Sequence, residues 1–384
     1  MTALDEALLA DADALARADT SQMLRGLASA GAQVRESVGL TEEAGLARFA
    51  ADGRPRALLI ASLGGSSVVT DVLTSLAGGT CPVPVVARRG GRLPSWIGAL
   101  DVVVAVSMSG RAPGPLELAA EASRRGARVL TVGAARSPLA EIGGRVGNLH
   151  VSPAEGVRAA GGSRSSRVAL WSLLTPVLMA ADALDLVKVP TGVLAEVADR
   201  LDAVAETCKP ATEPFVNPAK TLALELGGTA PVVLADSDLT AAAARRCASM
   251  LARTARVPAV GGALPDDASE IVATFGGPFA ARPDDVFADP FLDDPVGTRL
   301  QLLVLRDAPV ALTDAERHLV HAVTTTAADA GVRVSEVVAE PGPALVRLAE
   351  LIARTDFAAT YLALAAGIDP ATSPHVADLR DRLD

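Results

Sequence analysis

Two Gly/Ser-rich turns carry the residues best suited to chemistry in this chain of 384 residues. Their residues are Gly64, Gly65, Ser66, Ser107, Ser109 and Gly110. Glycine lets backbone N–H groups approach an anion, and serine hydroxyls add hydrogen-bond donors without adding charge. The two turns therefore predict a pocket for a phosphate group. The alternative interpretation is that they are ordinary turns without a ligand.

Each of these turns follows a short apolar run, at residues 57–61 and 101–106. Runs of Val, Ile, Leu and Ala that end in Gly or Ser are typical of buried strands in a parallel sheet. Ligands of open α/β sheets bind at the carboxyl ends of such strands. We therefore expect one sheet to bring both turns to the same edge.

Strand-like and helix-like segments alternate along most of the chain, which indicates βαβ units and parallel sheets. Strands are predicted at 57–61, 83–87, 101–106, 128–132, 148–151, 231–235, 256–260, 300–306 and 333–338. Helices are predicted at 68–77, 116–125, 139–143, 168–186, 190–226, 239–253, 314–330, 344–366 and 373–384. The predicted fold class is α/β, with two doubly wound parallel-sheet units packed together and added N- and C-terminal helices.

The same pattern suggests three segments. Residues 1–51 form N-terminal helices, residues 52–190 form the first unit with the phosphate-binding turns, and residues 191–384 form the second unit with the C-terminal helices. A Gly/Pro/Asp-rich stretch at 276–297 predicts a long loop or lid.

Composition excludes several classes of protein. Half of the residues are hydrophobic and 21% are charged, which is typical of a globular protein. A net charge of −10 without a basic block argues against a nucleic-acid partner. No apolar run reaches about 18 residues, and the N-terminus is acidic, so we expect a cytoplasmic protein with no membrane partner.

Cysteine and histidine spacing predicts neither a metal site nor a cofactor. The three cysteines are far apart in the sequence, which argues against a disulfide framework and a zinc site. His318 and His321 are three residues apart on one predicted helix, where a partly exposed helix face is preferred to a ligand pair. His150 follows a predicted strand and could approach the first pocket.

The sequence SLGGSS followed by SMSG resembles the sugar isomerase (SIS) domain, and the layout of the chain is similar to that of the bifunctional phosphoglucose/phosphomannose isomerases. Further matching stretches lie at 93–96, 165–170, 257–259, 264–265 and 356–370. The resemblance implies two SIS units, a sugar phosphate held by the first unit and a homodimer. It also implies that a threonine phosphate donor is replaced by Ala112, with Pro113 and Gly114 after it.

The resemblance also assigns candidate catalytic positions. Arg167 matches the arginine that faces the enediolate, although a structural salt bridge is an equal alternative. The position of the family's base is Arg253, and no histidine occurs at 264–270, where the family has one for ring opening. Arg380 replaces a C-terminal lysine. Glu270 is the nearby carboxylate that could act as a relocated base, with a solvated acidic turn as the commoner meaning.

Three functions follow from these residues. The first is a phosphosugar-binding protein of the glucose-6-phosphate/mannose-6-phosphate isomerase family that does not isomerise its ligand. The second is an active aldose–ketose hexose-phosphate isomerase that uses a relocated carboxylate such as Glu270. The third is a structural partner with a vestigial pocket.

Overall fold

The computed structural model describes residues 4–153, 167–280 and 298–382. The chain forms two compact units, and each contains one parallel sheet. The first-sheet unit consists of Arg25–Ala205 and Pro343–Ala349, and the second-sheet unit consists of Met1–Leu24, Glu206–Gly342 and Glu350–Asp384. This division follows the compactness of the two units in space and does not test domain boundaries along the sequence. The boundaries expected at residues 51/52 and 190/191 therefore remain a prediction.

The first sheet has the strand order β2-β1-β3-β4-β5, with every neighbouring pair parallel. The strands are β1 (Leu58–Ser62), β2 (Val85–Arg88), β3 (Val102–Ser107), β4 (Arg128–Gly133) and β5 (Leu149–Val151). Every residue of β1 and β3 is buried, as expected for central strands that are covered on both faces. The order places β1 and β3 side by side, as the two turns require.

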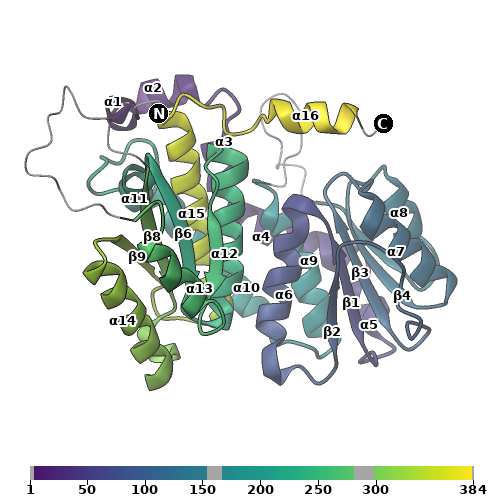
Figure 1. Ribbon diagram of the computed structural model, residues 1–384. Helices are drawn as coiled ribbons and strands as arrows, with labels where there is room; N and C mark the ends of the chain where they lie inside the picture. The colour runs from purple at the N-terminus through teal and green to yellow at the C-terminus, as the bar shows by residue number, and fades with distance from the viewer. Residues whose placement is uncertain (1–3, 154–166, 281–297, 383–384) are drawn as a thin grey trace, which may run out of the picture. The chain divides into compact units, whose positions relative to one another are not determined.

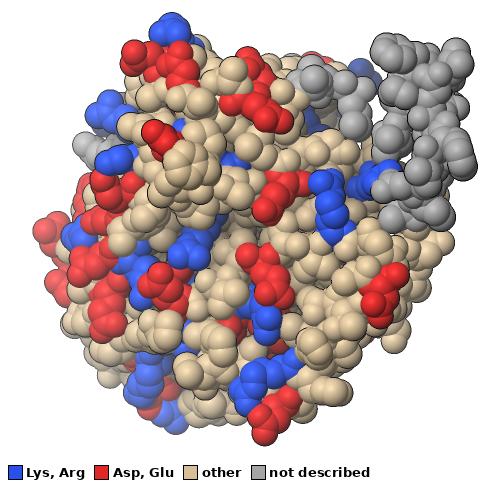
Figure 2. Space-filling model, turned by 90° about the vertical axis from the view of Figure 1, so that its left-hand side faces the viewer, with Lys and Arg blue, Asp and Glu red and all other residues tan. Residues whose placement is uncertain are grey.

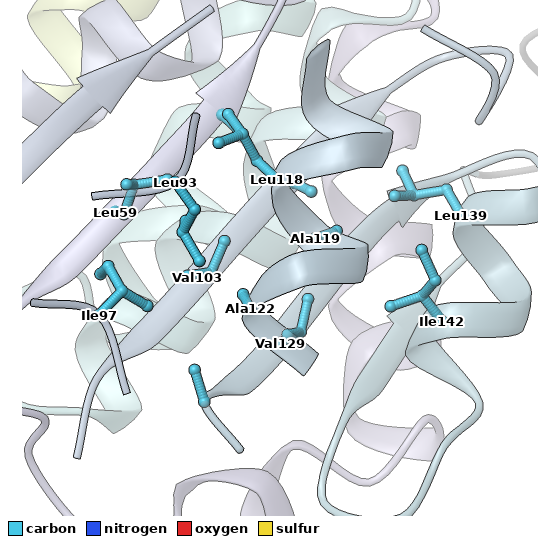
Figure 3. Packing of buried hydrophobic residues seen from close by; sticks show 13 residues of the cluster. Leu59, Leu93, Ile97, Val103, Leu118, Ala119, Ala122, Val129, Leu139 and Ile142 are labelled. Atoms are coloured by element: carbon cyan, nitrogen blue, oxygen red, sulfur yellow. The ribbon is translucent and has the colours of Figure 1, made fainter. Parts of the chain in front are cut away.

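Helices cover both faces of this sheet (Figure 1). They are α6 (Ser67–Ala77) and α9 (Leu170–Ala183) on one face, and α7 (Pro113–Arg124) and α8 (Pro138–Gly143) on the other. Alternate strand residues such as Leu59 and Val103 pack against Leu118 of α7 in one buried cluster (Figure 3). This alternation follows from the two-residue period of a strand, and the cluster fixes α7 and β3 relative to each other.

Five helices precede β1 in the described residues. They are α1 (Glu6–Ala10), α2 (Ala12–Ala18), α3 (Met23–Ala28), α4 (Ala30–Glu43) and α5 (Leu46–Ala50). In the first-sheet unit α4 packs along α9, and the buried Gln33 side chain donates from Nε2 to the Val168 carbonyl at 2.8 Å. This bond fixes the chain just before α9 begins.

The second sheet has the order β7-β6-β8-β9 and is also parallel. Its strands are β6 (Thr229–Ala235), β7 (Val260–Ala263), β8 (Arg299–Arg306) and β9 (Arg333–Val338). The remaining helices are α10 (Thr191–Thr207), α11 (Pro218–Leu226), α12 (Asp238–Met250), α13 (Ala268–Ala273), α14 (Asp314–Asp329), α15 (Ala344–Ala365) and α16 (Pro374–Asp381). The order β7-β6-β8-β9 repeats the order β2-β1-β3-β4 of the first sheet. In each sheet, the strand that comes first in the sequence, β1 or β6, therefore lies in the interior of the sheet.

Two sequence-based expectations are wrong in detail. The strand predicted at 256–260 begins only at Val260, because 251–255 form a π-helical turn and Arg256 then takes a left-handed φ of 57°. The single helix predicted at 190–226 is two helices, α10 and α11, because Pro210 and Pro214 interrupt it and proline cannot donate a helical hydrogen bond.

Helix hydrophobicity and surface charge were predicted from the composition and can be compared with the structure. In the described residues no helix is both long enough and apolar enough to cross a membrane. On the face that Figure 2 displays, acidic and basic side chains are interspersed, so this face offers no continuous basic surface to a polyanion.

Candidate functional site

The first candidate turn leads from β1 directly into α6. Gly64–Ser66 form a single 3₁₀ turn, and Gly64 has a φ of +60°, which glycine adopts without strain. Ser66 is buried and precedes the first residue of α6, but its side chain does not cap the helix. The first N–H groups of α6 therefore have no side-chain acceptor from the capping position.

The second turn leads from β3 into α7 and is held by its own hydrogen bonds. The Gly110 N–H donates to the Ser107 carbonyl at 2.8 Å, and the Ala112 N–H donates to Ser107 Oγ at 3.3 Å. Gly110 has a φ of +66°, and a Cβ there would lie 2.1 Å from Ser137 Oγ. Ser109 is exposed, and its Oγ accepts from the Arg111 N–H at 3.3 Å. The turn is thus fixed while one hydroxyl remains accessible.

The sheet brings the two turns to the same edge. β1 and β3 are adjacent and parallel, with Ser62 paired to Val106 in the register. Neighbouring strands lie about 4.8 Å apart, so the turns that follow them are within reach of one small anion. The juxtaposition of Gly64, Gly65 and Ser66 with the second turn is a feature of the structure, and the binding of phosphate by these residues remains a prediction.

The helices that start from these turns have N-termini without a side-chain cap. Neither Ser66 before α6 nor Ala112 before α7 provides a side-chain capping bond. By contrast, Ser137 caps α8 by accepting from the Ala140 N–H at 3.2 Å. Because a helix N-terminus carries a partial positive charge, α6 and α7 together favour an anion at this edge of the sheet.

The two candidate catalytic residues belong to different compact units. Arg167 lies in the first-sheet unit, three residues before α9, and is 9% exposed. Glu270 lies in the second-sheet unit, in the first turn of α13, and is exposed. Their catalytic roles remain predictions.

Three other positions singled out by the sequence have different environments. Arg253 is partly buried in the π-helical turn after α12, and its charge helps to oppose the rise in the pKa of Asp356. The side chain of Arg380, residues 165 and 166, and residues 281–297 of the expected loop lie outside the described part of the structure.

Within the first-sheet unit, His150 is not placed at the two turns. On β5, the ring of His150 is hydrogen-bonded to Thr131 Oγ1 at 2.8 Å and to Ser152 Oγ at 3.2 Å, and burial lowers its pKa. β4 separates β5 from β3. His318 and His321 are both exposed on α14. Among the described residues, no group of three or more His, Cys, Asp or Glu side chains could hold a metal ion.

The second sheet carries buried acids at the point that corresponds to the Gly/Ser turns. Asp236 follows β6 and Asp307 follows β8, and both are buried. Asp236 Oδ1 accepts from the Asp307 N–H at 2.9 Å and from Thr240 Oγ1 at 3.1 Å. Burial raises the pKa of Asp236 to about 6. The hydrogen bonds from the Asp307 N–H and from Thr240 oppose this rise, and the charge of the Asp307 carboxylate adds to it. This edge is acidic, and the buried Asp236 carboxylate already accepts the Asp307 N–H, so among the described residues it is less suited to an anion than the Gly/Ser edge of the first sheet.

This acidic pair does not follow from the Gly/Ser pattern, because an aspartate and not Gly or Ser comes after each of these two strands. The available signal was an aspartate directly after each of two neighbouring apolar strands, at Asp236 and Asp307. The cap of α12 strengthens the contrast with the first sheet, since Ser237 and Thr240 form a complete capping box there.

The raised pKa of Asp236 predicts a pH-dependent stability. The folded chain binds more protons than the unfolded chain between the usual carboxyl value and about pH 6, so stability is lost as pH rises through this window. Asp236→Asn removes the titrating group and keeps the oxygen that accepts from Asp307. We compare the free energy of unfolding of the variant with that of wild type at two pH values. The difference should be more favourable to the variant by about 2 kcal/mol at about pH 7.5 than at about pH 4.5.

Urea unfolding at the two pH values measures this difference. Asp329→Asn, which changes an exposed carboxylate on α14 of the same unit, is the matched control. Equal effects of Asp236→Asn at both pH values would contradict the prediction.

Comparison with known proteins adds a family to this geometry. Residues 215–383 match the bacterial phospho-glucose isomerase C-terminal SIS domain. A bifunctional phosphoglucose/phosphomannose isomerase of Caldicellulosiruptor bescii is 25% identical over 202 residues, which are 53% of this chain and 57% of that protein. The second half of the chain is thus similar to SIS-domain sugar isomerases. The match thus spans little more than half the length of the curated relative.

Solved structures show the same fold over nearly the whole chain. A hypothetical protein of Thermus thermophilus has a TM-score of 0.69 at 14% identity and covers 98% of this chain and 95% of its own. A phosphosugar isomerase described as putative, from Clostridium difficile, has a TM-score of 0.66 at 11% identity. The alignment covers 91% of this chain and 95% of that protein. Tagatose-6-phosphate ketose/aldose isomerase of Escherichia coli has a TM-score of 0.65 at 12% identity, with 92% and 94% covered.

The region that matches the family model and the candidate site lie in different parts of this chain. The matched region, 215–383, contains the second sheet, whereas both Gly/Ser turns precede it. The assignment of the phosphate site therefore depends on the geometry of the first sheet itself.

Proposed function

We propose that this chain binds a hexose phosphate at the turns after β1 and β3 and does not isomerise it through the positions that the family uses. The observation that carries the proposal is the pair of adjacent helix N-termini, at α6 and α7, that have no side-chain cap. The first turn of α6 offers its N–H groups beside the Ser66 turn, whereas in the first turn of α7 Pro113 and Pro115 have no N–H and Gly114 keeps one. Together with the serine hydroxyls of the two turns, these N–H groups favour a phosphate. The names of the relatives, which are sugar-phosphate isomerases, agree with this ligand class.

The proposal against isomerisation depends on the chemistry of Arg253. Moving a proton between C1 and C2 of a sugar needs a base, and a guanidinium cannot accept a proton near neutral pH. Arg253 stands where the resemblance places that base. We further propose, on the resemblance alone, that the protein acts as a homodimer in the cytoplasm.

Glu270 provides the competing hypothesis of an active isomerase. Its carboxylate is exposed at the start of α13, so it is accessible to a ligand. An aldose–ketose isomerase that uses Glu270 would convert fructose 6-phosphate and would lose turnover in Glu270→Gln. The binding hypothesis expects a ligand-dependent stabilisation with no turnover in either protein.

The exposed Ser109 hydroxyl gives the sharpest test of binding. If it donates to the phosphate, Ser109→Ala loses a hydrogen bond to a charged group. We then expect a dissociation constant that is about 10- to 100-fold larger. Thermal shift and calorimetric titration with fructose 6-phosphate and mannose 6-phosphate measure it. Ser95→Ala is the control, because Ser95 is an exposed serine beside Pro94, whose carbonyl accepts from Arg125 at the far end of α7.

The outcomes separate the three functions. Stabilisation by a hexose phosphate that Ser109→Ala weakens and Ser95→Ala keeps supports the proposed binding. Turnover that Glu270→Gln abolishes establishes the isomerase instead. No stabilisation by any hexose phosphate at millimolar concentration overturns the binding proposal and leaves the structural partner.

A further inference from the structure

A small hollow of about 90 Å³ lies beside the first candidate turn, between β1 and β2. Besides Ala87, its lining residues are Ser62, Ser67, Thr70, Asp71, Arg88 and Arg89. Ser62 and Ser67 flank the turn that contains Ser66, so the hollow adjoins the proposed phosphate site. It is not part of that site, because none of its lining residues belongs to the two turns.

Two guanidinium groups distinguish this hollow. Arg88 ends β2 and Arg89 follows it, and both are exposed. Among the described residues, neither has a hydrogen-bond or ion-pair partner for its side chain. Guanidinium groups bind phosphate and carboxylate through paired N–H donors, so the hollow is suited to an anionic group.

Close packing fixes the backbone that carries these arginines. A Cβ on Gly114 would lie 2.1 Å from the Arg89 carbonyl oxygen and 2.9 Å from Gly90 Cα. The segment after β2 therefore passes directly over the first turn of α7, where any side chain at position 114 would displace it. This contact holds Arg89 next to the helix that begins at the Ser109 turn.

The strand order sets the separation of the two places. β2, β1 and β3 are consecutive neighbours, so the ends of β2 and β3 lie about 10 Å apart, at two strand spacings. The phosphate turns lie at β1 and β3, and the arginines lie at β2. A hexose that carries a charged group on each end is long enough to reach from one place to the other.

We propose that the ligand of this chain is a doubly anionic hexose: one phosphate occupies the two Gly/Ser turns, and a second phosphate or a carboxylate occupies the hollow beside Arg88 and Arg89. This inference rests on the proposed function, because it extends the same ligand. Asp71, which also lines the hollow, can accept a hydrogen bond from a sugar hydroxyl, and this suits a polyol better than a free anion.

Calorimetric titration at constant ionic strength tests the inference with three ligands. These are fructose 6-phosphate, fructose 1,6-bisphosphate and 6-phosphogluconate. We expect at least one doubly anionic ligand to bind about 10-fold or more tightly than fructose 6-phosphate, as charge-assisted hydrogen bonds allow. The better ligand of the two identifies the second group as phosphate or carboxylate.

The double variant Arg88→Ala/Arg89→Ala should abolish this gain and leave the affinity for fructose 6-phosphate within about 2-fold of wild type. Arg92→Ala/Arg145→Ala is the matched control, since it removes two exposed arginines outside the hollow and the same charge. The control should keep the gain in affinity, because its two arginines do not line the hollow. A long-range effect of charge would instead be screened by salt and would be the same in both variants.

Each outcome decides the inference. Equal affinities for the three ligands in wild type overturn it and leave the proposed function intact. A gain that survives in Arg88→Ala/Arg89→Ala, or that is lost equally in the control, also overturns it. No binding of any of the three ligands overturns the proposed function and this inference together.

Discussion

Replacing Arg246 with methionine is expected to lower the free energy of unfolding of the second-sheet unit by about 3–5 kcal/mol. Arg246 of α12 donates to Asp356 of α15 from Nε at 3.0 Å and from Nη2 at 2.9 Å. The two residues are 2% and 4% exposed. Burial already raises the pKa of Asp356, and Arg246 opposes that rise. Without the guanidinium, the buried carboxylate loses its partner.

Urea unfolding at neutral pH measures the loss, with two comparisons. Arg246→Met/Asp356→Leu removes both charges and should recover most of the stability, because a buried pair can often be replaced by apolar side chains. Lys209→Met removes an exposed pair with Glu206 in the same unit and should cost less than about 1 kcal/mol. A single Arg246→Met variant as stable as Lys209→Met would contradict the prediction.

Lys220→Met is expected to cost about 3 kcal/mol or more, because it leaves buried acceptors without a donor. Lys220 is fully buried, and its Nζ donates to the carbonyls of Leu9, Pro210 and Thr212 at 2.6, 2.7 and 2.8 Å. Its ammonium also lies 5.5 Å from the centre of the Tyr361 ring. Burial lowers the pKa of Lys220, and the three carbonyls offset that cost of burying the charge.

Methionine keeps the unbranched shape of the lysine side chain up to the ε position and lacks the ammonium group, so the loss reports on the hydrogen bonds more than on packing. Lys209→Met is again the control, since it makes the same change at an exposed site of the same unit. Hydrogen exchange of the Leu9 segment provides a second measurement, and faster exchange there is expected if Lys220 holds it. Unchanged stability and unchanged exchange would show that the three bonds contribute nothing.

Local patterns are enough to predict the strands that position the site. The apolar runs 57–61 and 101–106 differ by one residue from β1 (Leu58–Ser62) and β3 (Val102–Ser107). These strands are buried on both faces, so hydrophobicity alone marks them. The parallel α/β class follows from the same runs and from the helices between them.

β7 shows where such patterns fail. Its four residues include Gly261 and Gly262, which have low strand propensity. A Cβ on Gly262 would lie 2.5 Å from Ile271 Cδ1, so close packing of α13 requires glycine there. Local patterns favour the more apolar stretch before it, because a requirement set by a residue nine positions later is not visible in a local window.

The candidate site is also predictable only in part. Gly64, Ser66 and Ser109 stand out because glycine and serine at strand ends have a recognisable chemistry. Arg88 and Arg89 do not, since their relation to Ser67 depends on the pairing of β1 with β2. Asp236 and Asp307 are each visible as an aspartate after an apolar strand, but their proximity depends on the pairing of β6 with β8.

The buried bond from Lys220 to Leu9 has a consequence for the order of biosynthesis. Leu9 and Lys220 are 211 residues apart in the chain yet belong to the same compact unit. A ribosome that adds about 5–20 residues per second leaves the first helices without that partner for roughly 10–40 seconds. During this interval most of the first-sheet unit is already synthesised. A nascent chain must therefore keep its beginning soluble and unpaired while its middle folds, and a chaperone has its best opportunity to bind there.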